Sequence, residues 1–113
     1  MTSLFGKLRN LISQPSEDIG FPPTVEAAVD KILLDLSEYN RTKIANMDDN
    51  RLKVFHQSYG IVLRNKFRLW TNDSLQQSCC EVSGLAKVNP DKASFIILKE
   101  LQNRTRQKHP LNG

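Results

Sequence analysis

The sequence has few of the histidine and cysteine residues that form metal sites and redox sites. It contains two histidines and two cysteines, and the cysteines, Cys79 and Cys80, are adjacent. Adjacent residues on a helix point about 100° apart, and no second Cys or His pair completes a set of four ligands around His56, so no metal site is expected. A disulfide between neighbours closes almost no loop and strains the backbone. Reduced thiols, as in a cytoplasmic protein, are therefore expected.

Long apolar runs and catalytic signatures are also missing. No run approaches the roughly 20 apolar residues that span a bilayer. The N-terminus lacks the continuous apolar region and cleavage site of a signal peptide. There is no glycine-rich phosphate-binding loop and no nucleophile elbow, and no two Asp or Glu residues have a spacing typical of a catalytic pair. The sequence therefore predicts a cytoplasmic protein that is not an enzyme and has no cofactor.

The composition fits one domain with a genuine core, since 39% of the 113 residues are hydrophobic. The net charge of +4 is unevenly placed: residues 1–14 carry +2, residues 99–113 carry +3, and the rest sum to −1. Positive charge concentrated at the two ends supports nucleic-acid binding less well than a basic groove built into the fold.

Apolar residues recur with helical spacing, and no segment shows sustained alternation with period two, so the fold is expected to be all-α. We expect an N-terminal amphipathic helix in residues 1–14, a linker at 15–23, a helical domain of four to five helices at 22–103, and a basic tail at 104–113. Helix starts are expected at the capping residues Thr24, Ser37, Asp48 or Asp49, Asn72 or Asp73, and Asn89. The last helix has few apolar residues beyond Leu101, so its end is expected to fray.

The segment 49–69 is expected to be the central helix. One apolar face holds Leu52, Phe55, Tyr59, Leu63 and Trp70. Val54 and Ile61 fall roughly opposite, and two apolar faces predict packing on both sides. Gly60 costs about 1 kcal/mol relative to Ala in mid-helix. We interpret it as room for a crossing helix or, alternatively, as a functional kink.

The candidate binding residues lie at the end of this segment and are Arg64, Asn65, Arg68 and Trp70. Arg64 and Arg68 are one turn apart and can hold an anion or a peptide carboxylate. Arg and Trp are also enriched at the energetic centres of interfaces. Structural roles are the alternative: Asn65 can satisfy backbone groups, Arg64 can pair with Asp73 or a carbonyl, and Trp70 can lie in the core.

The two ends of the chain are further candidates for contacts. Residues 1–14 present an apolar stripe made of Leu4, Phe5, Leu8, Leu11 and Ile12. This stripe can dock on its own domain or on a second copy, giving a homodimer, whereas two cations predict only weak membrane binding. The basic C-terminal end can contact phosphates, but it has no interleaved aromatic residues, and we favour a solvated helix end.

Three motifs resemble a family of small bacterial helical domains without an assigned function. They are residues 23–28 (Pro-Thr-Val-Glu-Ala-Ala), the stretch from Gly60 to Trp70, and residues 90–94 (Pro-Asp-Lys-Ala-Ser) before Ile96 and Ile97. The resemblance covers about residues 22–101 and implies a fold class and a bacterial origin, but no mechanism. The family usually has Trp and then Gly where this chain has Phe67 and Arg68.

Together these features predict a protein-interaction domain of the bacterial cytoplasm whose partner is a protein. Two alternatives stay open. One is a nucleic-acid-associated protein that uses its basic ends, for which affinity would fall steeply with salt. The other is an enzyme whose pocket gathers polar groups from distant segments.

Overall fold

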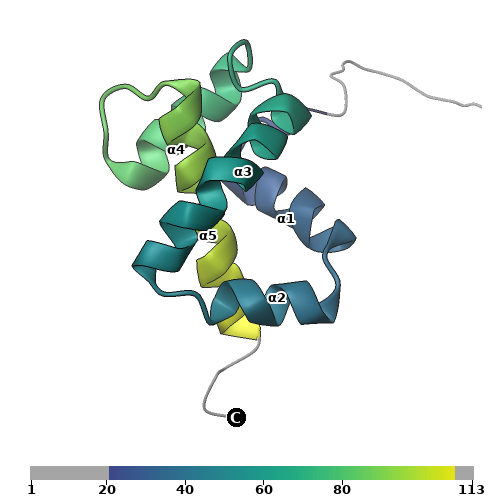
Figure 1. Ribbon diagram of the computed structural model, residues 1–113. Helices are drawn as coiled ribbons and strands as arrows, with labels where there is room; N and C mark the ends of the chain where they lie inside the picture. The colour runs from purple at the N-terminus through teal and green to yellow at the C-terminus, as the bar shows by residue number, and fades with distance from the viewer. Residues whose placement is uncertain (1–20, 109–113) are drawn as a thin grey trace, which may run out of the picture.

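Five α-helices form the computed structural model, which describes residues 21–108 (Figure 1). They are α1 (Val25–Asp35), α2 (Glu38–Ala45), α3 (Asp49–Phe67), α4 (Asp73–Ser83) and α5 (Pro90–Lys108). The described part of the chain contains no strand, so the expected all-α fold is confirmed. The expected N-terminal helix, most of the linker and the last five residues of the basic tail lie outside the described residues.

Each helix begins at a side chain that accepts a hydrogen bond from a backbone N–H of the first turn. The caps of the first four helices are Thr24, Ser37, Asp48 and Asn72. At α5, Asn89 Oδ1 accepts from the backbone N–H of Lys92 at 2.7 Å, and Pro90 is the first helical residue. These contacts satisfy donors that have no partner within the helix. All five predicted helix starts are confirmed.

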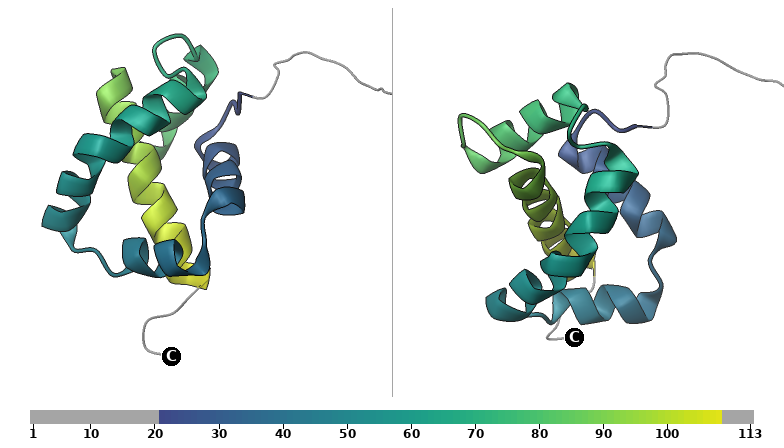
Figure 2. Two further views of the ribbon diagram at one scale, coloured as in Figure 1. Left: turned by 45° about the vertical axis from the view of Figure 1, so that its right-hand side comes forward. Right: turned by 45° about the horizontal axis from the view of Figure 1, so that its top comes forward.

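The helix on which the others pack is α5. It contacts α1, α2, α3 and α4, whereas among those four only α1 and α4 share a substantial contact. Figure 2 shows α5 running between α3 and α1. Its buried residues are Ala93, Ser94, Ile96, Ile97, Leu98, Leu101, Gln102 and Thr105. The expectation that segment 49–69 is the central helix is therefore wrong.

The second apolar face of α3 has no neighbour in residues 21–108. Val54 is 64% exposed and Ile61 is 51% exposed, while Leu63 on the α5 side is fully buried. Within the described residues the predicted packing on both sides is therefore wrong. Single Val and Ile side chains on a surface are tolerated without a neighbour. The helix also ends at Phe67, two residues earlier than expected, so Trp70 is not on its buried face.

The end of α5 does not fray after Leu101. Gln102 and Thr105 are each 1% exposed. Gln102 Nε2 donates to the carbonyl oxygens of Ile44 at 3.0 Å and Met47 at 2.9 Å. Polar side chains, which a hydrophobic pattern does not register, therefore hold this end of the helix.

The next turn of α5 repeats this contact. Arg106 Nε donates to the Ala45 carbonyl at 2.8 Å, and its terminal nitrogen donates to the Met47 carbonyl at 3.0 Å. The last carbonyls of a helix have no partner within it. Side chains of α5 thus cap the C-terminal end of α2.

Candidate functional site

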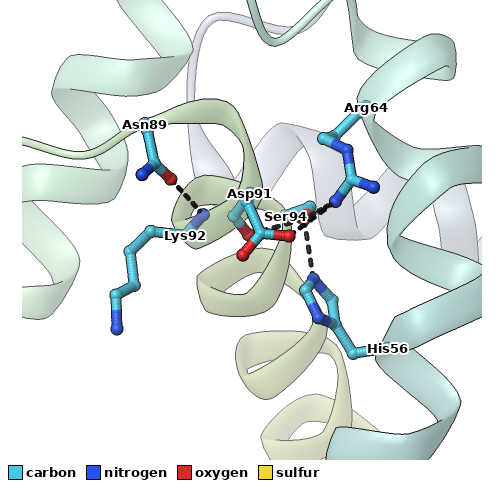
Figure 3. Close-up of polar contacts among 6 residues, drawn as sticks. All are labelled: His56, Arg64, Asn89, Asp91, Lys92 and Ser94. Atoms are coloured by element: carbon cyan, nitrogen blue, oxygen red, sulfur yellow. Dashed lines mark hydrogen bonds and ion pairs between the residues drawn. The ribbon is translucent and has the colours of Figure 1, made fainter.

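A polar cluster joins α3 to the first turns of α5 (Figure 3). His56, Gly60 and Arg64 are spaced by four residues and share one face of α3. Arg64 donates to Asp91 Oδ1 at 3.0 Å and to Ser94 Oγ at 3.2 Å. His56 Nε2 lies 2.8 Å from the same Oγ, and the Ser94 hydroxyl lies 2.8 Å from the Asp91 carbonyl oxygen, to which it donates. The cluster ties the two helices together.

The environment of the imidazole in this cluster favours its neutral form. Burial lowers the pKa of His56 below its usual value, and the positive charge of Arg64 lowers it further, while Asp91 opposes both. The ring also packs edge-on against Phe95, with centroids 5.1 Å apart. The ion pair of Arg64 with Asp91 is partly solvated, because the Asp91 side chain is 75% exposed, and such pairs contribute little to stability.

The pairing of a serine with a histidine invites comparison with a nucleophilic site. Ser94 is fully buried, and its hydroxyl already contacts His56, Arg64 and the carbonyl of Asp91. A nucleophile must be presented to its substrate with the base in hydrogen-bond reach. The arrangement satisfies a buried hydroxyl and does not expose it.

Two side chains of the polar cluster, His56 and Arg64, occupy the space beside Gly60. A Cβ atom there would lie 2.7 Å from Nε2 and 2.8 Å from Cδ2 of His56, and 3.0 Å from a terminal nitrogen of Arg64. The glycine therefore makes room for two side chains of its own helix. The three nearest atoms all belong to α3, so the expected close approach of a crossing helix is not what limits the space here.

The four predicted binding residues do not form one site. Arg64 belongs to the polar cluster, and its partner is Asp91, not Asp73. Asn65 is exposed, and its side chain makes no hydrogen bond or ion pair with any residue between 21 and 108. Arg68 and Trp70 lie together in the turn between α3 and α4.

Two exposed aromatic residues and an exposed arginine lie at or near this turn: Arg68 and Trp70 within it, and Phe21 in the segment before α1. We call these three residues the turn surface. Arg68 has left-handed backbone angles, φ 52° and ψ 49°, and its carbonyl accepts hydrogen bonds from two later backbone N–H groups at 2.9 Å each. Its guanidinium lies 5.4 Å from the centroid of the Phe21 ring. Phe21 is 45% exposed and Trp70 is 51% exposed, so Trp70 is not a core residue.

Asn72 fixes the backbone around the turn surface. Its Nδ2 donates to the carbonyls of Pro22 and Phe67 at 3.2 Å each, and its Oδ1 accepts from the N–H of Leu75 at 3.1 Å. One side chain thus connects the segment before α1, the end of α3 and the start of α4. The sequence identified Asn72 as a cap, but the long-range contact with Pro22 carries no local signal.

A hollow of about 600 Å³ adjoins the turn surface and is lined by Phe21, Pro23, Arg68, Thr71, Asn72 and Ser74. It combines an aromatic ring, a guanidinium and hydroxyl groups. These are groups that can hold an apolar side chain beside a carboxylate.

A family model described as a domain of unknown function, DUF6794, matches residues 21–105. The chain belongs to the DUF6794 family. The match includes both the polar cluster and the turn surface, and it ends within α5. No curated protein and no solved structure matches the chain.

The basic residues near the end of this DUF6794 domain are engaged in the fold. Arg104 pairs with Asp30 at 2.7 Å, Lys99 pairs with Asp49 at 3.5 Å, and Arg106 donates to backbone carbonyls. In residues 21–108, no three His, Cys, Asp or Glu side chains are placed to hold a metal ion. No helix in the same residues has the length and apolar character needed to cross a membrane.

Proposed function

We propose that this DUF6794 domain is a non-enzymatic protein-interaction domain of the bacterial cytoplasm, and that its partner binds at the turn surface. The observation that carries the proposal is Trp70. It is the chain's one tryptophan, and it lies half exposed next to Arg68 in a rigid turn. Trp and Arg are the residues that most often dominate binding energy at interfaces.

The turn is built to hold its shape before a partner arrives. The left-handed residue Arg68 reverses the chain, and Asn72 connects three segments beneath the turn. A preformed surface loses less conformational entropy on binding. The chemistry of the hollow fits a peptide segment that places a carboxylate on Arg68 and an apolar side chain beside Phe21.

Other observations favour binding over the alternatives. In the one close serine–histidine pair of the described residues the serine, Ser94, is fully buried, which argues against its use as a nucleophile. Arg104 and Arg106 are held by Asp30 and by backbone carbonyls, which leaves them less available to phosphates. Cys79 and Cys80 are both free thiols, which fits a reducing compartment.

The test begins with the tagged full chain, purified from its own host, and identifies by mass spectrometry what is retained. Binding of the purified partner is then measured for Trp70→Ala and for Val82→Ala, a control on α4 with the same exposed fraction, 50%. Trp70→Ala should weaken binding about 30-fold or more, as for an interface hot spot, and Val82→Ala should leave it unchanged.

Two results would contradict the proposal. One is equal binding by wild type and Trp70→Ala. The other is retention of nucleic acid with an affinity that falls steeply with salt, which would favour the nucleic-acid alternative.

A further inference from the structure

An apolar groove separates α2 from α3. A cavity of about 290 Å³ lies between Leu36, Met47, Phe55 and Tyr59. A second cavity of about 440 Å³ continues along α3 to Val54, and it shares Met47 and Phe55 with the first. We call the combined hollow the α2–α3 groove.

The groove exists because both of its walls pack on a third helix. Both α2 and α3 contact α5 and share little contact with each other, so their facing sides stay apart. The rings of Phe55 and Tyr59 stack at 4.9 Å along the α3 wall. Both rings are only half buried, and Val54 at the rim is 64% exposed. The sides of these side chains that face the groove therefore lack a neighbour among residues 21–108.

The chain itself contains a segment with the matching pattern. Residues 4–12 carry apolar side chains at helical spacing on one face, namely Leu4, Phe5, Leu8, Leu11 and Ile12. An isolated helix of this length is marginal in water, so the segment needs an apolar surface to become ordered. An amphipathic helix that lays its apolar face into a groove is a recurrent mode of recognition.

The connecting chain is long enough to reach the groove of the same molecule. The nine residues from Ile12 to Phe21 span up to about 30 Å when extended, and their prolines and glycine disfavour a continuous helix. The groove lies near Leu36, at the far end of α1, and the eleven residues of α1 rise only about 16 Å. The short connection also gives the segment a high effective concentration at the groove.

From this geometry we propose that residues 4–12 bind as an amphipathic helix in the α2–α3 groove of their own chain. The segment binds the groove of its own molecule, because the linker is long enough to reach that groove and no second copy is needed. This site is separate from the turn surface, so the inference stands independently of the proposed function.

Amide hydrogen exchange on the full chain tests the proposal. In wild type, the amides of residues 8–12 should be protected to the same degree at every protein concentration. Val54→Asp places a charge on the rim of the groove and should abolish that protection. Val82→Asp, at a similarly exposed position on α4, is the matched control and should leave the protection intact.

A second variant changes the N-terminal segment instead of the groove. Leu8→Asp should abolish protection of residues 8–12 and shift the ring resonances of Phe55 and Tyr59 in NMR spectra. Unprotected amides in wild type, or protection that survives Val54→Asp, would overturn the proposal. Protection that rises with protein concentration would overturn it too, since a second copy would then supply the segment.

Discussion

The imidazole of His56 lies where a side chain on residue 60 would be, with Nε2 only 2.7 Å from the position of a Cβ atom on Gly60. The ring is held there by Ser94, whose hydroxyl oxygen is 2.8 Å from the same Nε2. The absence of a side chain at position 60 and the contact between α3 and α5 are therefore linked.

The effect of Gly60→Ala on stability should depend on whether His56 is present. In a His56→Ala background, the methyl group should raise the free energy of unfolding by about 1 kcal/mol, the usual advantage of Ala over Gly in a helix. In wild type this gain should be cancelled or reversed, because the methyl displaces the imidazole from Ser94. Urea denaturation of the four proteins gives the coupling energy. An equal gain in both backgrounds would contradict this packing.

Stability should depend on pH through His56. Its pKa in the folded protein is below the ordinary value of 6.5, mainly through burial and further through Arg64. The unfolded chain therefore takes up a proton at higher pH than the folded chain does. The free energy of unfolding should be constant near neutral pH and should decrease as the pH falls below 6.5.

The measurement compares urea denaturation of wild type and His56→Gln between about pH 5 and pH 8. The variant should lose less stability on acidification than wild type does. Identical pH profiles would show that the imidazole is not the group responsible.

Arg68→Gly and Arg68→Ala should differ in stability by about 1 kcal/mol, with the glycine variant more stable. Both variants lose the contact of the guanidinium with the Phe21 ring, but only glycine adopts φ 52° without a steric cost. Thermal and urea denaturation of the pair provide the test. Equal stability would mean that the left-handed conformation at residue 68 is not maintained in solution.

Arg106→Ala should lower the free energy of unfolding by about 1–2 kcal/mol, because the carbonyls of Ala45 and Met47 lose charged donors. Arg104→Ala is the matched control, two residues earlier on the same helix. It removes a partly solvated ion pair with Asp30 and should cost about 1 kcal/mol or less. A larger loss of unfolding free energy for Arg104→Ala than for Arg106→Ala would contradict the conclusion that Arg106 contributes more to stability.

The two adjacent cysteines should react very differently. Cys79 is fully buried, and burial together with the neighbouring thiol raises its pKa to about 12. Cys80 is half buried and lines a surface hollow. Iodoacetamide should therefore label Cys80 in the folded protein and both cysteines in denaturant, as measured by mass spectrometry of peptides. Labelling of Cys79 in the folded protein would indicate that α4 opens readily.

The local features of this fold were predictable from sequence, and its long-range polar contacts were not. Helix starts are recognisable at Thr24, Ser37 and Asn89, because a capping side chain accepts a hydrogen bond from an N–H group only two or three residues later in the sequence. Gln102 and Arg106 act on carbonyls more than fifty residues away, and no spacing in the sequence indicates such a partner. The hydrophobic pattern consequently placed the end of the last helix too early.

The candidate site was predicted in part for a related reason. Helical spacing placed Arg64, Arg68 and Trp70 together, but the left-handed residue at 68 ends that spacing, and nothing in an arginine signals positive φ. A glycine at this position would have signalled it. Arg64 is therefore in the polar cluster, while Arg68 and Trp70 remain together in the turn surface.

The helix that all the others contact is also the last of the five along the chain. During synthesis, α1 to α4 are made before the residues of α5 that they pack against. Apart from the contact between α1 and α4, their buried apolar side chains, with Val29, Leu52 and Leu75 among them, lack the helix they pack on until α5 is made. Nascent chains in such a state are open to aggregation and to chaperones, so completion of α5 is the event that closes the core.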